Sequence, residues 1–447
     1  MWSRLRSMWT IGDLRKKILI TIGLLLIFRI VAYVPVPGID SAALAQNLKG
    51  NSNLNQLFGL IDVFSGGSLS TFSVVSMGLY PFITASIVMQ LLQPIIPRLD
   101  AMAREGESGR NRMAQITRYI TVPLALLQGF SQMALLVNAG LIPSSSFNLF
   151  DGTYFLPTAA TLITLTAGTM FLVWIGELIT ENGIGNGISL IIFANIMVRL
   201  PQTIGSALVS SGSTGTTNSN NGGLLTILAI AIVALGMIFA MVFVYQAQRR
   251  VPVQYPTKRR FLSGVRTGQQ TTYIPLMVNS AGMIPLIFAS SILLLPTVIA
   301  NFVAYSSSAG VKTLFTNIRL WLDASNWYYW FIYGALVALF TFFYATVIWQ
   351  QQNMADNLQK QGAFIPGIRP GLPTEEYLNK ILMRITFGGA LFLGIVAIAP
   401  ALLGHSGDVN NQPVQAASLL IVVGVVLDTL KQLEAQMVMR NYSGFLR

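Results

Sequence analysis

The sequence predicts an all-α polytopic membrane protein with ten transmembrane helices in two inverted, pseudo-symmetric halves of five. Composition is the first observation: 53% of the 447 residues are hydrophobic, only 10% are charged, and the mean hydropathy is +0.61. An ordinary soluble domain carries about 25% charged residues. This composition excludes a water-soluble enzyme, a disordered chain and a fibrous one. The chain has no cysteine and one histidine, so we expect no disulfide, no metal site and no cofactor.

The second observation is the number of long apolar runs, since about 20 apolar residues cross a bilayer once. Arg199 and Pro201 interrupt the fifth run, which is therefore the weakest. The expected spans are 18–36, 74–96, 117–137, 156–177, 188–208, 224–245, 274–296, 328–349, 382–403 and 416–434.

The basic residues support this count, because most of them lie in the two tails and in alternate connections between spans. Basic residues stay on the cytoplasmic side. Both termini are therefore predicted to be cytoplasmic, and residues 139–153, 209–223, 300–326 and 404–414 are predicted to be outside. The net charge of +12 then belongs to the cytoplasmic face, where it suits anionic lipid or an acidic partner.

Residues 1–17 are expected to form a cytoplasmic amphipathic segment, because Trp2, Leu5 and Trp9 follow helical spacing with arginines between them. A cleaved secretory signal is the other interpretation. It is disfavoured because Arg29 interrupts the apolar run that follows. Arg29 is also the one clear charge within a span, and we expect it to pair or to satisfy backbone carbonyls.

The third observation is an internal repeat: residues 78–86 read GLYPFITAS and residues 282–290 read GMIPLIFAS, at a constant offset. Five spans per half is an odd number, so the second half must insert upside down. Each segment places a glycine and a proline within an apolar helix, where we expect a kink. Two matched, bendable helices indicate a seam that opens. The expected organisation is a first half at 18–209, a flexible external hinge linker at 210–223, a second half at 224–434 and a cytoplasmic tail at 435–447.

Two long basic cytoplasmic loops, near 246–273 and 350–381, are too long for tight helix hairpins. They present either a docking surface for an acidic or nucleic-acid partner or a plain topology signal. No nucleotide-binding loop and no catalytic constellation is present, so the chain is not expected to be an enzyme. If material moves through it, another protein must supply the energy.

Several motifs occur in order along the whole chain, among them FSGGSLS (64–70), YPFITASIV (80–88), GTMFLVWIGELITENGIGNGIS (168–189), PLMVNSAGMIP (275–285) and GAFIPGIRPG (362–371). On these motifs the chain resembles the SecY family of protein-translocation channels. The resemblance implies an hourglass channel in the bacterial cytoplasmic membrane, which passes unfolded secretory chains and releases hydrophobic segments sideways into lipid. It also implies a lateral gate between the second and seventh spans and a plug after the first, near 54–69.

The resemblance also implies roles for individual residues. The constriction is a ring of apolar side chains: Leu79, Ile83, Ile192, Ile196, Ile287 and Ile421. The plug includes Leu57, Phe58, Ile61, Phe64, Gly66 and Gly67. The lateral gate includes Gly78, Pro81, Asn279, Gly282 and Pro285, and partner docking falls to Arg249, Arg250, Lys258 and Arg369.

The partners that the resemblance implies are SecE-like and SecG-like small membrane subunits, a SecA-like motor ATPase, the ribosome, signal sequences, nascent polypeptides and anionic lipid. Two other classes stay open on the sequence. A secondary transporter of a small solute would need an ionisable site at mid-membrane. A scaffold without a pore would need neither an apolar ring nor a plug.

Overall fold

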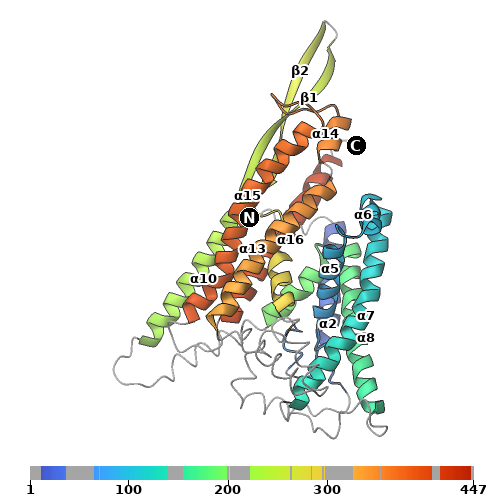
Figure 1. Cartoon of the computed structure of the whole chain (residues 1–447), viewed down its shortest axis with the longest axis vertical. Helices are drawn as coiled ribbons and strands as arrows, with labels where there is room; N and C mark the ends of the chain where they lie inside the picture. Colours follow the sequence, from blue (N-terminus) through green and yellow to red (C-terminus); the bar gives the residue numbers. More distant parts are fainter. Residues whose placement is uncertain are drawn as a thin grey trace.

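A computed structural model describes residues 12–36, 65–69, 71–138, 155–198, 201, 222–261, 264–282, 284–293, 296, 326–352, 354–404 and 413–443. The described chain is mostly helical, as the sequence predicts (Figure 1). Residues 1–11 of the expected segment 1–17 lie outside the described residues. So do residues 210–221 of the expected linker 210–223.

The described first half consists of α-helices. They are α2 (Gly12–Val31), α5 (Tyr80–Leu92), α6 (Pro97–Arg104), α7 (Glu107–Asn138), α8 (Phe155–Asn182) and the helix Gly187–Val198. α7 packs against α5 and α8, and α2 packs against α8. In Figure 1 α2, α5, α6, α7 and α8 lie side by side on one side of the molecule.

The second half contributes α10 (Gly222–Gln246), the helix Ile284–Leu293, α13 (Trp327–Gln352), α14 (Met354–Lys360), α15 (Leu372–Gly404) and α16 (Pro413–Ser443). α13 packs along α15, and α16 packs against α10 and α15. The helix Ile284–Leu293, yellow in Figure 1, lies in the middle of the view, between these helices and α5.

Not all expected spans have full length in the described part of the chain. Three helices there are long and apolar enough to cross a membrane: Phe155–Asn182, Trp327–Lys360 and Leu372–Ala399. A fourth results if Tyr80–Leu92 and Pro97–Ala103, which are bent by 104°, count as one span. Shorter apolar helices lie within the expected fifth, sixth and seventh spans. The count of ten therefore stays a prediction.

A β-hairpin departs from the expected all-α class. Strand β1 (Gln248–Phe261) pairs antiparallel with β2 (Gly264–Met277), and the hairpin projects from one end of the helices (Figure 1). The expected seventh span, 274–296, therefore begins as strand. The cause is local alternation: Val251 and Val253 are buried while Pro252 between them is exposed, a period of two that suits a strand with one covered face.

The base of the hairpin packs on the second basic loop. Val251, Val253 and Leu276 form one apolar cluster with Leu358 and Ile365. Gln254 and Phe364 exchange two backbone hydrogen bonds, of 2.9 and 3.1 Å. The two long basic loops of the sequence thus form one structural unit.

The sequence predicts that the glycine and proline of each repeat segment kink a helix from within. In the structure they do not. Gly78 and Gly282 have φ angles of 58° and 65°, and the helices begin two residues later, at Tyr80 and Ile284. A positive φ suits glycine, because it has no Cβ. Each proline then stands in the first helical turn, where its missing N–H costs nothing. The two segments share a local structure, and it is a helix start.

The main apolar core takes side chains from both halves of the chain, from Phe28 and Leu79 in the first to Ile287 and Val425 in the second. We call this set of buried residues the central cluster. A separate cluster in the first half joins Leu69 and Phe72 to α7 and α8. The two halves thus share one packed interior.

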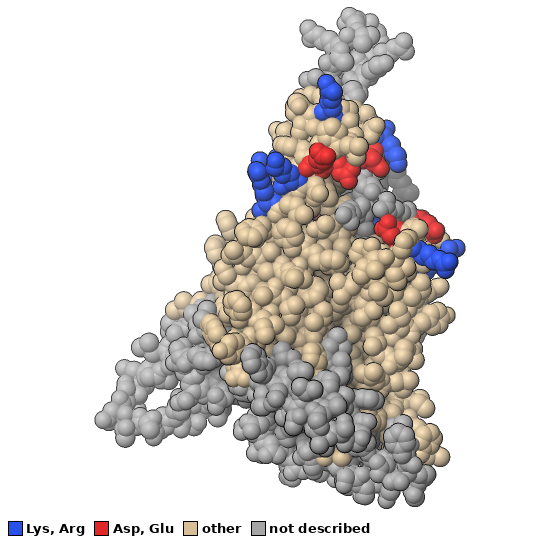
Figure 2. All heavy atoms as spheres, in the orientation of Figure 1, with Lys and Arg blue, Asp and Glu red and all other residues tan. Residues whose placement is uncertain are grey.

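Charged side chains gather at the hairpin end of the molecule. On the face shown in Figure 2, the Lys, Arg, Asp and Glu side chains lie at and just below that end, and a wide uncharged band follows. This segregation matches the separation of basic connections from apolar runs in the sequence.

Candidate functional site

The six residues predicted to form the apolar ring all belong to the central cluster. They are Leu79, Ile83, Ile192, Ile196, Ile287 and Ile421, exposed by 2%, 7%, 3%, 1%, 6% and 3%. They come from α5 and the residue before it, the helix Gly187–Val198, the helix Ile284–Leu293 and α16. Four chain segments from two halves thus bring branched aliphatic side chains into one contact network. Such side chains offer an ion nothing to replace its hydration shell.

The predicted gate residues lie at the starts of the two repeat helices. Gly78 and Gly282 form the positive-φ turns, and Pro81 and Pro285 are buried in the turns that follow. Asn279 is 4% exposed, and its Nδ2 donates a 3.0 Å hydrogen bond to the Gly282 carbonyl. The amide thereby holds the turn that starts the helix Ile284–Leu293.

One contact at this seam involves a residue that sequence reasoning missed. The Tyr80 hydroxyl donates a 2.8 Å hydrogen bond to the main-chain carbonyl of Ser291. It joins the first turn of α5 to the helix Ile284–Leu293. The available signal in the sequence is a hydroxyl inside an otherwise apolar segment, where the other repeat has Ile284.

Of the predicted plug residues, Gly66 and Gly67 are described; Leu57, Phe58, Ile61 and Phe64 lie outside the described residues. Gly66 has a φ of 67°, and a Cβ on it would overlap the side chain of Asn195. No larger residue fits there without a shift. Its segment, Ser65–Leu69, therefore packs directly on the helix that carries Ile192 and Ile196.

Arg29 holds the same segment from α2. Its Nη1 donates a 3.0 Å hydrogen bond to the Gly66 carbonyl, and its guanidinium lies 5.1 Å from the centre of the Tyr33 ring. The expectation that this arginine satisfies a backbone carbonyl is confirmed. Its partner, 37 residues away, did not follow from the sequence.

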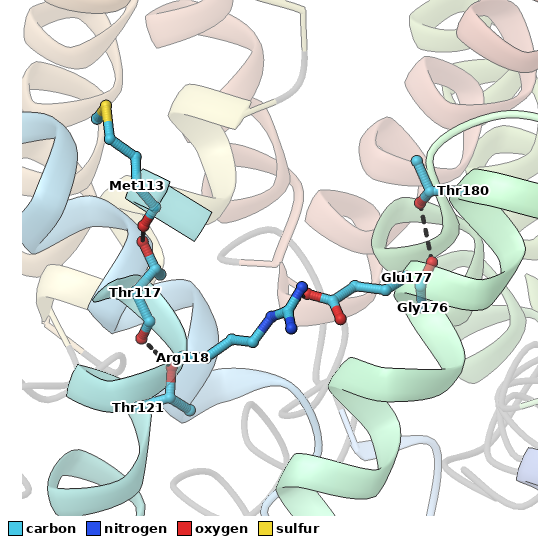
Figure 3. A network of polar contacts seen from close by, with 7 residues as sticks. All are labelled: Met113, Thr117, Arg118, Thr121, Gly176, Glu177 and Thr180. Carbon is cyan, nitrogen blue, oxygen red and sulfur yellow. Dashed lines mark hydrogen bonds and ion pairs between the residues drawn. The ribbon is translucent and has the colours of Figure 1, made fainter. Parts of the chain in front are cut away.

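A polar network ties α7 to α8. Arg118 Nε and Glu177 Oε1 form an ion pair at 2.6 Å, and Thr117, Thr121 and Thr180 each donate to a carbonyl one turn earlier in their own helices (Figure 3). The Arg118 and Glu177 side chains are 43% and 25% exposed. A partly exposed pair contributes at most about 1 kcal/mol. We assign it a structural role.

The predicted docking residues lie on the unit formed by the hairpin and the second loop. Arg249 and Arg250 are exposed at the start of β1, and the Lys258 side chain is outside the described residues. Arg369 is exposed in a turn between Gly367 and Gly371, and its carbonyl accepts a 2.8 Å hydrogen bond from the Thr374 hydroxyl. The turn is fixed while the charge faces outward.

Within the described ranges, no Asp, Glu, Lys or Arg side chain is buried, and the buried hydroxyl and amide groups belong to Ser, Thr, Tyr, Asn and Gln. The same ranges contain no group of three or more His, Asp or Glu side chains that could hold a metal ion. The buried interior of these ranges therefore offers polar contacts without charged side chains, and Asp428 of α16 is partly buried.

Comparison with known proteins decides the family. The family model SecY matches residues 73–430. The protein translocase subunit SecY of Mycobacterium bovis is 40% identical over 442 residues, covering 97% of each chain. The chain belongs to the SecY family. Another member with the same description, from Streptomyces scabiei, is 41% identical over 439 residues and 97% of each chain.

Solved structures show the same fold at low sequence identity. One described as a protein conducting channel has a TM-score of 0.62 and 16% identity, with 95% of this chain and 93% of that chain covered. Sec61, in the canine ribosome-channel complex from the endoplasmic reticulum, has a TM-score of 0.58 over the same shares. The SecY fold is thus shown for this multi-pass membrane protein.

Proposed function

We propose that this chain is the protein-conducting channel of a translocase: it passes unfolded polypeptides across the membrane and releases hydrophobic segments sideways into lipid. The observation that carries the proposal is the burial of the six predicted ring residues in one apolar cluster. Membership of the SecY family supplies the function, and the central cluster gathers all six predicted ring residues where the two halves meet. Branched side chains can close around a moving peptide without binding any one sequence.

The proposal extends to the seam and the plug. The lateral gate lies between α5 and the helix Ile284–Leu293, whose glycines share one backbone conformation. Residues 54–69 are the plug, held at its end by Arg29 and Asn195. In a SecY protein of known structure, which matches this fold with a TM-score of 0.61, the plug domain stabilises the closed state of the channel and maintains a membrane seal.

We further propose ten spans in two inverted halves, 18–209 and 224–434, with 210–223 as the external hinge and both termini cytoplasmic. The corresponding starts at Tyr80 and Ile284 support the repeat. The charged end in Figure 2 supports the orientation, because basic side chains stay in the cytoplasm. Residues 1–17 then lie in the interface and 435–447 form a cytoplasmic tail.

The unit formed by the hairpin and the second basic loop, with Arg249, Arg250, Lys258 and Arg369, is the proposed docking surface for a motor ATPase or for ribosomal RNA. The chain itself is proposed to lie in the bacterial cytoplasmic membrane. Small SecE-like and SecG-like subunits and anionic lipid complete the assembly. The absence of fully buried Asp, Glu, Lys and Arg side chains in the described ranges argues against an ion-coupled transporter of small solutes.

Reconstitution tests the function. Proteoliposomes that contain the chain with its small subunits, a motor ATPase and ATP should protect a signal-bearing secretory chain from added protease. The same precursor without the apolar stretch of its signal is the control and should stay accessible. A folded chain that protects neither precursor, yet accumulates a small solute, would contradict the channel and favour a transporter.

A further inference from the structure

The Tyr80 hydroxyl crosses the seam between the two halves of the chain. It donates a 2.8 Å hydrogen bond to the Ser291 carbonyl, 211 residues away. A carbonyl oxygen has two lone pairs, so it can accept this bond in addition to any bond within its own helix. The tyrosine is partly buried and Ser291 is 2% exposed, so little water competes for the bond.

The bond lies about one helical turn from the apolar ring. Tyr80 precedes Ile83 by three residues, and Ser291 follows Ile287 by four, a spacing that puts each pair on one helix face. Separation of α5 from the helix Ile284–Leu293 at the ring therefore pulls directly on this bond.

The first-half side of the bond is anchored. The Thr84 hydroxyl donates to the Tyr80 carbonyl at 3.0 Å, and Gln128 Nε2 of α7 donates to the Thr84 hydroxyl at 3.4 Å. The start of α5 is thus tied to α7, in its own half. Because that anchor stays with the first half, an opening seam must break the bond from Tyr80 to Ser291.

The fold itself does not require a hydroxyl here. The repeat-related residue is Ile284, and its helix starts after the same glycine turn with an apolar side chain. A buried tyrosine hydroxyl usually finds some partner. What distinguishes Tyr80 is that its hydroxyl reaches a main-chain carbonyl in the other half.

We propose that Tyr80 is a specificity-determining residue: its hydroxyl latches the seam and sets how hydrophobic a signal sequence must be to open it. This inference rests on the proposed channel function. An apolar signal has to supply the free energy of breaking a hydrogen bond in apolar surroundings before it gains contact with lipid. Weakly apolar segments then fail to open the seam.

The test is Tyr80→Phe, which removes the hydroxyl and keeps the ring. The first readout needs no transport: spin labels on Val88→Cys and Ile292→Cys, introduced into a chain that has no native cysteine, report the separation of the two helices. We expect the fraction of molecules with an open seam to rise about 5- to 30-fold, because the loss of a buried hydrogen bond of about 1 to 2 kcal/mol changes an equilibrium by that factor. Transport of a precursor with a shortened apolar signal should rise by a similar factor, and that of a strong signal should not change.

Two further variants complete the test. Tyr119→Phe, on a residue of α7 that is 77% exposed, makes the same chemical change away from the seam and should alter neither readout. Tyr80→Ile copies the residue of the other repeat and should act like Tyr80→Phe. If one of the two variants fails to fold, the other still tests the latch. Unchanged label distances and unchanged weak-signal transport in both Tyr80 variants would overturn the latch. Changed distances without transport in any variant, the unmodified chain included, would instead refute the channel function and keep the latch.

Discussion

Arg369→Glu abolishes motor-driven transport while the chain still inserts and folds. Among the described residues the Arg369 guanidinium makes no hydrogen bond or ion pair, and its turn is held by the Thr374 hydroxyl, which donates to the Arg369 carbonyl. Charge reversal therefore leaves the turn intact. At an interface, like charges facing each other cost several kcal/mol, so we expect transport to fall on the order of 100-fold.

ATP-driven protection of a precursor in proteoliposomes measures this loss, with membrane extraction and thermal unfolding as controls for folding. Arg98→Glu, at an exposed residue of α6, reverses a charge outside the hairpin unit and should leave transport near normal. Loss of the Arg369→Glu protein from the membrane would show a structural arginine, and normal transport would remove the docking role.

Ile287→Asn opens the seal. Ile287 is 6% exposed within the central cluster, on the helix that starts after the Gly282 turn. An amide there needs hydrogen-bond partners that the aliphatic neighbours cannot supply, which destabilises the closed state by about 1–3 kcal/mol. Water then enters a constriction that is otherwise dry. Ion leak through the resting channel should rise, and precursors with defective signals should cross more easily.

Ion flux from loaded vesicles and transport of a signal-defective precursor measure the two effects. Ile163→Asn, at a residue of α8 that is 64% exposed, adds the same amide to the outer surface and should change neither. Normal expression of Ile287→Asn with no added leak and no relaxed selectivity would show that the ring is assigned wrongly.

Features that depend on local composition followed from the sequence. Apolar runs predict most of the helices, because hydropathy is a property of a short window. The repeat located two corresponding helix starts, at Tyr80 and Ile284, although proline inside an apolar run suggested a kink. A proline in the first turn of an apolar helix and one in its middle can both be surrounded by apolar residues in the sequence. Only the backbone structure distinguishes the two positions.

Features that depend on pairing did not follow. The hairpin depends on the pairing of two strands, 248–261 and 264–277. It was not predicted because the apolar run from Ile274 onward looks, in the sequence, like the start of a span. The bonds from Tyr80 to Ser291 and from Arg29 to Gly66 join distant residues through main-chain carbonyls, which leave no trace in side-chain identity. The ring residues came from the family resemblance, since apolar residues at four-residue spacing fill every span.

The central claim is that a translocating polypeptide passes through the central cluster between the two halves. Site-specific photo-cross-linking of a stalled precursor tests it most directly, with a photoreactive residue in place of Ile83, Ile192, Ile287 or Ile421. Leu339 of α13, 60% exposed, provides the matched position on the outer surface. We expect adducts with the stalled chain at the four ring positions and none at Leu339. A precursor that is stalled partway across and cross-links at none of the ring positions would contradict the account.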